Sequence, residues 1–179
     1  MRIRTSTVPP HASEGHPGRN ATTGAGAFVY HGSLAVARSI ERDFTAAEKY
    51  LRGDSIMSRT FDHLEHARST TFVTGNAHDD DHYNFAMKTV AWDPHSALQT
   101  TSGGRQSPAL GLGHELVHAD ESPTIRAHLD ATYDPAYDNR EERRVILGAE
   151  THAARTLGEG TRHDHGGRVY HVNSPTVLA

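Results

Sequence analysis

The stretch SPALGLGHELVHAD, residues 107–120, organises the fold that the sequence predicts. It opens with a serine followed by a proline, and this pair is typical of a helix start. Serine caps the free backbone amides, and proline fits the first helical position. Apolar residues recur through the stretch and give the helix a face to bury. We therefore expect a partly buried helix from residue 108 to about residue 120.

This predicted helix carries the pattern H-E-x-x-H. His114 and His118 stand four residues apart, so their side chains share one face of the helix and can bind one zinc ion at about 2.0–2.1 Å per nitrogen. Glu115 lies beside the pair, where it can take a proton from the water that such a metal activates. The chain has no cysteine, so histidine and carboxylate side chains must hold any metal.

A zinc ion that acts in catalysis needs a third protein ligand. The segment NREERR, residues 139–144, begins a second predicted helix, with Asn139 as its cap. Glu142 shares a helical stripe with the apolar residues that follow it, so we expect it to face the first helix and to be the third ligand. Glu141 points about 100° away and suits a supporting role, holding a histidine ligand or an arginine. Asp164 is a rival third ligand.

Further elements surround these two helices. Hydrophobic periodicity and turn residues predict helices at 34–51, 55–67 and 140–157, strands at 27–31, 70–74, 86–92 and 168–172, polar loops at 75–82 and 96–106, and an irregular crossover at 122–138. The first 24 residues lack periodicity and have almost nothing to bury. We therefore expect residues 1–24 to be disordered and residues 25–179 to form one folded domain.

The composition argues against two classes of protein, those that span a membrane and those that bind nucleic acid. The chain has 179 residues and a formal net charge of −4 with neutral histidines. It has no apolar run near the ~20 residues that span a bilayer, so we expect no membrane span. It also lacks a basic stripe, which argues against a nucleic-acid partner. We expect a monomer that binds neither membrane nor nucleic acid.

The two motifs together resemble a known family. H-E-L-x-H-A at 114–119, followed by E-E-x-R at 141–144 and a nearby Gly148, resembles the NleD/HopH-type effector metallopeptidases of Gram-negative pathogens. It is similar, more distantly, to the clostridial neurotoxin light chains. The resemblance covers about residues 28–172, and the glycine comes one residue later than in those families. It implies an α+β, zincin-like fold, in which a small mixed sheet accompanies the H-E-x-x-H helix and a second, ligand-bearing helix.

The resemblance also implies a function. It makes Glu142 the ligand beside His114 and His118, around one Zn²⁺ ion, and it implies a zinc-dependent endopeptidase. Such effectors pass through a type III secretion system into the host cell cytoplasm and cleave host signalling proteins, with MAP kinases as the targets of the NleD branch. By this resemblance the chain is a secreted bacterial effector with a host protein substrate, and residues 1–24 are its export segment.

The same resemblance names candidates for the group that stabilises the oxyanion during hydrolysis. In the related neurotoxins an arginine and a tyrosine three residues apart take this role. Arg162 and His165 stand at this spacing, with histidine where tyrosine would be expected, and they join Glu115 as the catalytic candidates. Tyr170 is the alternative. A second interpretation, outside the enzymes, also stays open. In this interpretation the chain is a non-catalytic effector that binds metal or a partner protein on the same scaffold.

Overall fold

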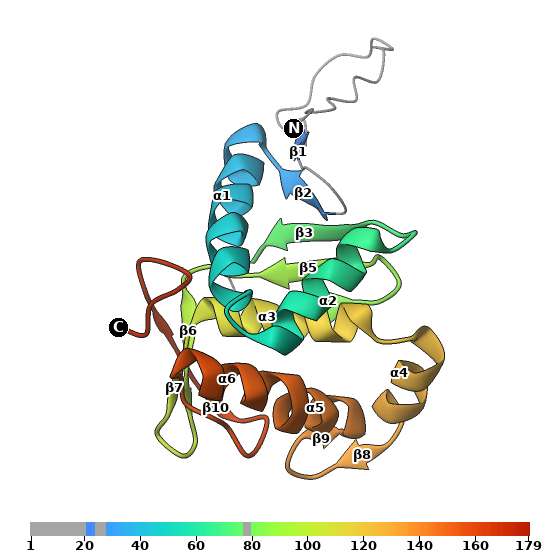
Figure 1. The fold of residues 1–179 in the computed structure, drawn as a ribbon, viewed down its shortest axis with the longest axis vertical. Helices are drawn as coiled ribbons and strands as arrows, with labels where there is room; N and C mark the ends of the chain where they lie inside the picture. Colours follow the sequence, from blue (N-terminus) through green and yellow to red (C-terminus); the bar gives the residue numbers. More distant parts are fainter. Residues whose placement is uncertain (1–20, 24–27, 77–79) are drawn as a thin grey trace.

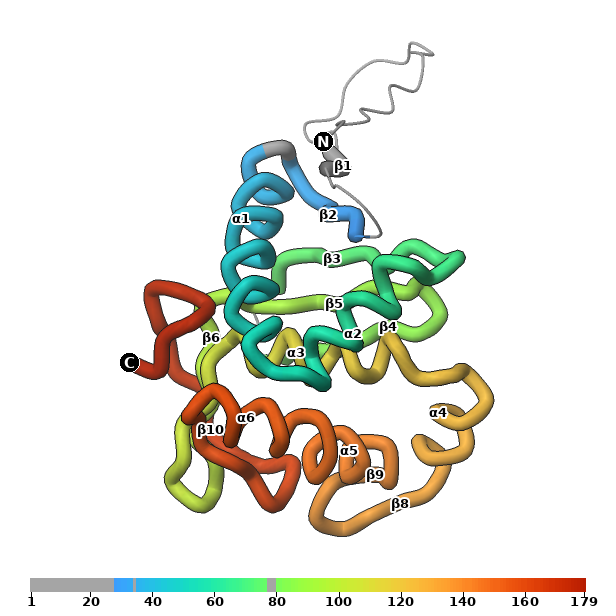
Figure 2. Tube along the Cα trace, viewed as in Figure 1, coloured from blue at the N-terminus to red at the C-terminus, as the bar shows by residue number. Residues whose placement is uncertain are grey.

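The computed structural model describes residues 21–23, 28–76 and 80–179, which form a mixed α and β fold (Figure 1). A five-stranded sheet and three helices occupy the upper part of the view, and the C-terminal helices with two smaller sheets occupy the lower part. Figure 2 traces the same chain as a tube, which passes from the upper to the lower part on the right-hand side. Within these residues, no helix combines the length and apolarity needed to cross a membrane.

The five-stranded sheet has the order β1-β2-β3-β5-β4. Its strands are β1 (Ala21–Thr23), β2 (Phe28–Gly32), β3 (Thr71–Gly75), β4 (His82–Asn84) and β5 (Thr89–Trp92). The central strands β2, β3 and β5 run parallel, and β1 and β4 pair antiparallel at the two edges. Parallel neighbours need a long crossover. Helices α1 (Leu34–Leu51) and α2 (Ser55–His66) supply the one between β2 and β3.

Helices α1, α2 and α3 (Pro108–Asp120) contact one another, and α1 and α3 also contact the sheet. Aromatic rings fill the space between them. The ring of Phe44 in α1 lies 4.8 Å from that of Phe28 and 6.0 Å from that of Phe61, measured between centroids. Burying each such side chain contributes about 1.5–3 kcal/mol. The apolar core is therefore what holds α3 against the sheet.

The start of α3 is fixed from three directions. Glu159 of the C-terminal segment accepts hydrogen bonds of 2.7 Å from the backbone N–H and the hydroxyl of Ser107, and from the hydroxyl of Tyr50 in α1. The indole N–H of Trp92, at the end of β5, donates to the carbonyl of Pro108 at 2.8 Å. Ser107 also caps α3, as the sequence predicts. These bonds set the depth and rotation of α3, and with them the positions of its histidines.

One continuous helical segment carries the second set of polar residues. It consists of α5 (Arg140–Val145), a π turn (Ile146–Glu150) and α6 (Thr151–Leu157). The side chain of Asn139 caps it by accepting from the N–H of Glu142 at 2.9 Å. It ends at Gly158, whose φ of +75° is left-handed. The helix predicted over 140–157 is confirmed, with a π turn that the periodicity did not indicate.

The loop predicted at 96–106 is wrong. This stretch is a hairpin of β6 (Ser96–Thr100) and β7 (Arg105–Gln106). Strand β10 (Gly167–His171) pairs with β6 and completes a three-stranded sheet. Strand β6 is stabilised by its pairing with β10, which comes much later in the chain. The sequence of residues 96–106 alone does not indicate this pairing.

The irregular crossover predicted at 122–138 is also wrong. It contains α4 (Pro123–Asp130), whose first turn is capped by Ser122. It also contains a short hairpin of β8 (Tyr133–Asp134) and β9 (Asp138–Asn139). A serine before a proline is the same start signal that marks α3, and it could have indicated α4.

The boundary of the N-terminal segment differs from the prediction. Ala21–Thr23 form β1, which pairs with β2 with Thr22 opposite His31. The expectation of disorder through residue 24 is therefore wrong for this strand. The rest of that segment, residues 1–20 and 24, lies outside the described residues.

Asp54 is a buried carboxylate that holds the start of α2. It accepts from the backbone N–H groups of Ile56 and Met57 at 2.9 and 3.0 Å, and from His152 at 2.6 Å. Burial by itself raises the pKa of a carboxyl. Here these hydrogen bonds outweigh burial, and the pKa of Asp54 falls below its ordinary value of 3.8.

We expect Asp54→Ala to lower the free energy of unfolding by about 1–2 kcal/mol, because it removes the cap of α2. Because folding lowers the pKa of Asp54, its contribution is complete above the unfolded value of 3.8 and is lost as the pH falls through the folded value. Urea titrations at neutral and acidic pH measure the difference. Asp130→Ala is the control: this carboxylate lies 3.6 Å from Arg126 on the surface and should cost less than about 1 kcal/mol. Equal losses in the two variants would contradict the cap.

Candidate metal centre

His114 and His118 of α3 and Glu142 of α5 meet at one point, as the sequence predicts. The Nε2 atoms of the two histidines are 3.0 Å apart. Glu142 reaches both rings: its Oε2 lies 2.9 Å from Nε2 of His114, and its Oε1 lies 3.2 Å from Nε2 of His118. Both rings are buried, and Glu142 is partly exposed.

These separations suit donor atoms around one small cation. Donors placed tetrahedrally at about 2.0–2.1 Å from an ion lie about 3.3 Å from one another, close to the 2.9–3.2 Å found here. A second combination, His114 with Glu142 and His165, also brings its donor atoms within 4.8 Å of one another. The centre could therefore hold a metal ion.

Each ring is held from behind by a carboxylate. Glu150 lies 2.7 Å from Nδ1 of His114, and Glu141 lies 3.0 Å from Nδ1 of His118. A hydrogen on each Nδ1 suits these carboxylates, and a ring that then loses its Nε2 proton directs the lone pair of Nε2 to the shared point. Arg144 donates to Glu141 at 2.6 and 2.8 Å. Glu141 thus holds both a histidine and an arginine, the two supporting roles expected for it.

Protons alone satisfy this cluster poorly. Burial disfavours a charged His114 ring, but its hydrogen bonds with Glu142 and Glu150 raise its pKa to about 10. The pKa of His118 is raised against burial in the same way. Protonating both rings would set two N–H groups 3.0 Å apart, and leaving both neutral would set two lone pairs against a carboxylate. A single extra proton lets one ring donate to Glu142 but leaves the lone pair of the other Nε2 facing the same carboxylate. One cation between them would satisfy all three groups.

The π turn brings Glu150 onto the same helical face as Glu142. Two turns of a regular α-helix take about 7.2 residues, so a residue eight positions after Glu142 would be rotated away from the centre. A π turn holds an additional residue through its i→i+5 pattern and absorbs the difference. The hydroxyl of Thr151 donates to the carbonyl of Ile146 at 2.7 Å, within this wide turn. Sequence periodicity does not reveal a π turn, so Glu150 was not predicted.

Glu115 lies beside the centre rather than in it, as the motif predicts. Its Oε1 is 4.0 Å from Nε2 of His114, and the side chain is buried. Burial raises the pKa of Glu115, against the opposing effect of the two histidines. The backbone of Tyr83 in β4 lies close enough to this carboxylate to lower its pKa, which places Glu115 near the edge of the sheet. Glu115 is therefore placed to exchange a proton with a molecule at the centre.

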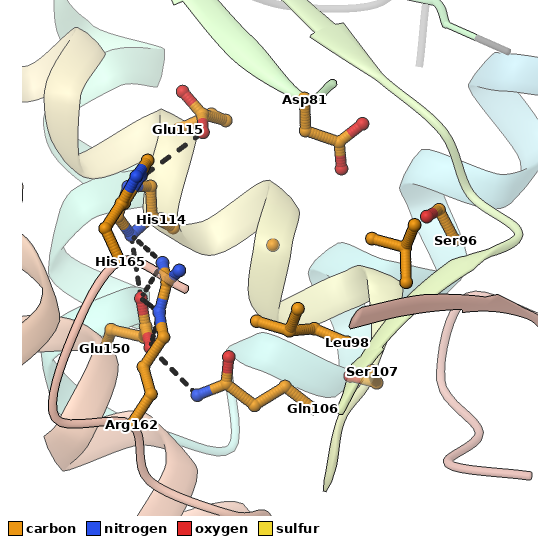
Figure 3. A pocket seen from close by; sticks show the side chains of 12 residues that line it. Asp81, Ser96, Leu98, Gln106, Ser107, His114, Glu115, Glu150, Arg162 and His165 are labelled. Atoms are coloured by element: carbon orange, nitrogen blue, oxygen red, sulfur yellow. Dashed lines mark hydrogen bonds and ion pairs between the residues drawn. The ribbon is translucent and has the colours of Figure 1, made fainter. Parts of the chain in front are cut away.

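A cavity of about 130 Å³ opens on this centre (Figure 3). Its polar side includes His114, Glu115, Glu150, Arg162 and His165, and its apolar side includes Leu98 and Val169. In Figure 3, Leu98 lies across the cavity from His165. A bound molecule would meet charged groups on the wall of the two histidines, and a mixture of apolar and polar groups, Asp81 and Ser96 among them, on the other.

Arg162 is buried and is paired with a carboxylate. Its Nε and Nη2 donate to Glu150 at 2.9 and 2.8 Å, and Nη2 lies 3.1 Å from Nδ1 of His114. Since Nδ1 also donates to Glu150, the guanidinium and the ring share one acceptor. The amide of Gln106 donates to the same carboxylate at 2.8 Å, a contact that the sequence did not indicate. Arg162 thus lines the cavity and also supports the position of His114, and its role at the oxyanion stays a prediction.

Of the three remaining candidates, only His165 lines the cavity, whereas Tyr170 and Asp164 do not. His165 lines the cavity, and its Nε2 lies 3.4 Å from Glu142. Tyr170 is not part of that lining, because its hydroxyl donates to a backbone carbonyl near the C-terminus at 2.7 Å. Asp164 accepts from the hydroxyl of Thr101, in the turn between β6 and β7, at 2.6 Å and from the N–H of Gly166 at 2.9 Å, and it does not line the cavity. The alternatives at Tyr170 and Asp164 are therefore not supported.

Comparisons with known proteins found no match to this chain, whether among protein-family models, curated proteins or solved structures. The resemblance of the two motifs to effector metallopeptidases therefore stays a prediction. The geometry of the centre is the observation that bears on function.

Metal binding to this centre should release protons. Because the pKa of His114 is raised to about 10 in the metal-free protein, this ring is charged at pH 7 and must lose a proton when Nε2 binds a metal. We expect about one proton released per metal ion and an affinity that falls as the pH falls. Titration calorimetry of Zn²⁺ binding in two buffers of different ionisation enthalpy measures the release. The same apparent enthalpy in both buffers would contradict it.

Proposed function

We propose that this protein is a zinc-dependent endopeptidase. One observation carries the proposal: two imidazole nitrogens and a carboxylate converge at separations of 2.9–3.2 Å, with Glu115 beside them and a cavity in front. Two histidines and one carboxylate are the ligand set of a class of catalytic zinc sites, which keep one coordination position open. His114, His118 and Glu142 would hold the ion.

The chain's own residues would move the protons of peptide hydrolysis. When bound, zinc would supply Lewis acidity, which lowers the pKa of water and polarises a carbonyl. Glu115 would take a proton from the attacking water as its oxygen bonds to the carbonyl carbon, and would pass it to the amide nitrogen as the C–N bond breaks. A carboxylate whose pKa is raised by burial suits both transfers. Arg162 would stabilise the charge on the carbonyl oxygen, and His165 is the second candidate for this role.

The edge strand β4 offers a place for the substrate. Within the described part of the chain, β4 pairs with β5 alone, so its other edge can pair with an extended peptide. This strand contacts α3, and the backbone of Tyr83 lies near Glu115, so a peptide paired with β4 would pass close to the group that transfers protons. A binding mode that extends along a strand favours cleavage within a chain over removal of its last residue.

A zincin-like fold and a cellular role belong to the same proposal. An antiparallel edge strand, an H-E-x-x-H helix against the sheet and a second helix with a carboxylate support the fold. The resemblance of residues 114–119 and 141–144 supports the role. On that basis the protein would be a secreted bacterial effector, delivered into the host cytoplasm, where it cleaves signalling proteins such as those of the MAP-kinase class.

The first test is the metal itself. We expect the purified protein to bind one zinc ion per chain, measured by elemental analysis after dialysis at neutral pH. His118→Ala should weaken zinc binding by about 100-fold or more, because it removes a ligand and not only a supporting group. His128→Ala, a change at an exposed histidine of α4, is the matched control and should leave binding unchanged. Circular dichroism verifies that both variants fold. Absence of stoichiometric zinc in the wild-type protein would end the proposal.

The second test is the proton-transfer residue. We expect Glu115→Gln to keep the fold and the bound zinc but to lower the cleavage rate by about 10²–10⁴-fold, because the amide cannot accept the proton. Incubation with eukaryotic cell extract, followed by mass spectrometry of new N-termini, identifies substrates and measures the rate. Glu41→Gln on α1 is the control and should cleave as the wild type does.

The alternative function predicts no difference in cleavage between the wild-type and Glu115→Gln proteins. A non-catalytic metal- or partner-binding effector would hold zinc, but wild-type and Glu115→Gln proteins would then leave the same N-termini in the extract. Identical N-termini, with zinc bound to both the wild-type and the Glu115→Gln proteins, would favour a non-catalytic binding function over peptidase activity.

A further inference from the structure

His165 is a third imidazole at the candidate metal centre. It lies in the loop between α6 and β10, and its Nε2 is 3.4 Å from Oε2 of Glu142. Its donor atom and those of His114 and Glu142 all lie within 4.8 Å of one another. Donors of one tetrahedral ion are about 3.3 Å apart, so a small movement of this side chain would bring it within bonding distance of the same ion.

The three rings at the centre are supported in the same way. Carboxylate oxygens of Glu150, Glu141 and Asp138 lie 2.7, 3.0 and 2.6 Å from the Nδ1 atoms of His114, His118 and His165 respectively. A carboxylate on Nδ1 fixes the hydrogen there and leaves the lone pair of Nε2 for a metal, which is the usual support of a metal-binding histidine. His165 therefore presents its Nε2 toward Glu142 with the chemistry of a ligand.

The backbone keeps Asp138 in place for this contact. Asp138 lies in β9 with a φ of +67°, a left-handed conformation that is uncommon outside glycine. The backbone N–H of His165 donates to the carbonyl of Ala136 in the same hairpin at 2.9 Å. The loop and the hairpin are thus joined through both backbone and side chain. A conformation of this kind persists where the surroundings enforce it, and such positions gather at functional sites.

The hairpin that carries Asp138 runs directly into α5. Within residues 138–142, Asp138 supports His165, Glu141 supports His118, and Glu142 lies between the rings. One short segment therefore orients two of the three imidazoles and supplies the shared carboxylate. The support of His165 belongs to the construction of the centre and is not a separate surface contact.

His165 differs from the other two rings in exposure. Its side chain is 40% exposed, whereas those of His114 and His118 are 4% and 5% exposed. The rings on α3 cannot leave without opening a void in the core. A ring on a loop at the mouth of the cavity can turn toward solvent at little cost.

We propose that His165 is a fourth protein ligand of the metal and that it yields its place to the substrate. The inference rests on the metal centre of the proposed function and adds a residue to it. In the resting protein the ring occupies the coordination position that a peptide carbonyl needs. Entry of an extended peptide along β4 moves the ring outward, so the protein is closed until a substrate is present.

Cobalt(II) tests this inference, because its visible absorption reports the number and type of ligands without any measurement of cleavage. We compare the full-length wild type with His165→Ala, Asp138→Asn and the control His163→Ala, which changes an exposed histidine of the same loop. We expect His165→Ala to change the cobalt spectrum and to weaken Co²⁺ and Zn²⁺ binding by about 10-fold or more, since even supporting groups contribute 10–100-fold.

Three further measurements, with added imidazole, Asp138→Asn and His163→Ala, make the test more specific. Added imidazole should return the spectrum of cobalt-loaded His165→Ala toward that of the wild type, because the free ligand can fill the vacated position. Asp138→Asn keeps a residue that tolerates the left-handed backbone and should weaken binding by a smaller factor. His163→Ala should match the wild type in both spectrum and affinity.

The outcomes separate this inference from the proposed function. Equal spectra and affinities for wild-type and His165→Ala proteins would overturn the inference and leave the peptidase intact. Slower cleavage by His165→Ala with unchanged metal binding would also overturn it, in favour of a role for the ring at the carbonyl oxygen. A wild-type protein that binds neither metal would overturn both.

Discussion

The convergence of His114, His118 and Glu142 on one point imposes a charge requirement that shapes the surrounding site. Two lone pairs and a carboxylate cannot face each other in a buried space without a compensating positive charge. Behind them, Glu141 and Glu150 add two more carboxylates, which Arg144 and Arg162 balance. Glu142 and Glu115 remain without a guanidinium partner among these contacts. A divalent cation would neutralise this pair, which is a reason to expect a metal there that does not depend on any sequence motif.

The fold supplies this centre with rigid supports. The start of α3 is held by Glu159, Trp92 and its own serine cap, so the two histidines are placed by the core and not by a loop. The facing helix reaches the centre twice because its π turn returns Glu150 to the face of Glu142. Groups held on helices keep their geometry better than groups on loops. Among the three rings at the centre, only that of His165 lies on a loop, and it is the most exposed of the three.

Features of this protein that depend on neighbouring residues can be predicted from the sequence, whereas features that depend on distant partners cannot. The caps at Ser107 and Asn139, the spacing of the two histidines and the choice of Glu142 all follow from residues within a turn or two of each other. The hairpin of β6 and β7 depends on β10, and the loop predicted there was wrong for that reason. The roles of Glu150 and Asp138 depend on a π turn and on a left-handed residue, neither of which has a pattern in the chain.

The sequence by itself determined which residues can share a helical face, because the helical repeat converts spacing into direction. It therefore specified the pair on α3, the neighbouring Glu115 and the acidic start of α5. Only the tertiary structure decided how far apart these groups are, which carboxylate supports which ring, and that His165 faces Glu142. Those facts depend on how two helices and a loop pack against one another, and packing is set by the shape of the whole core rather than by any single stretch of residues.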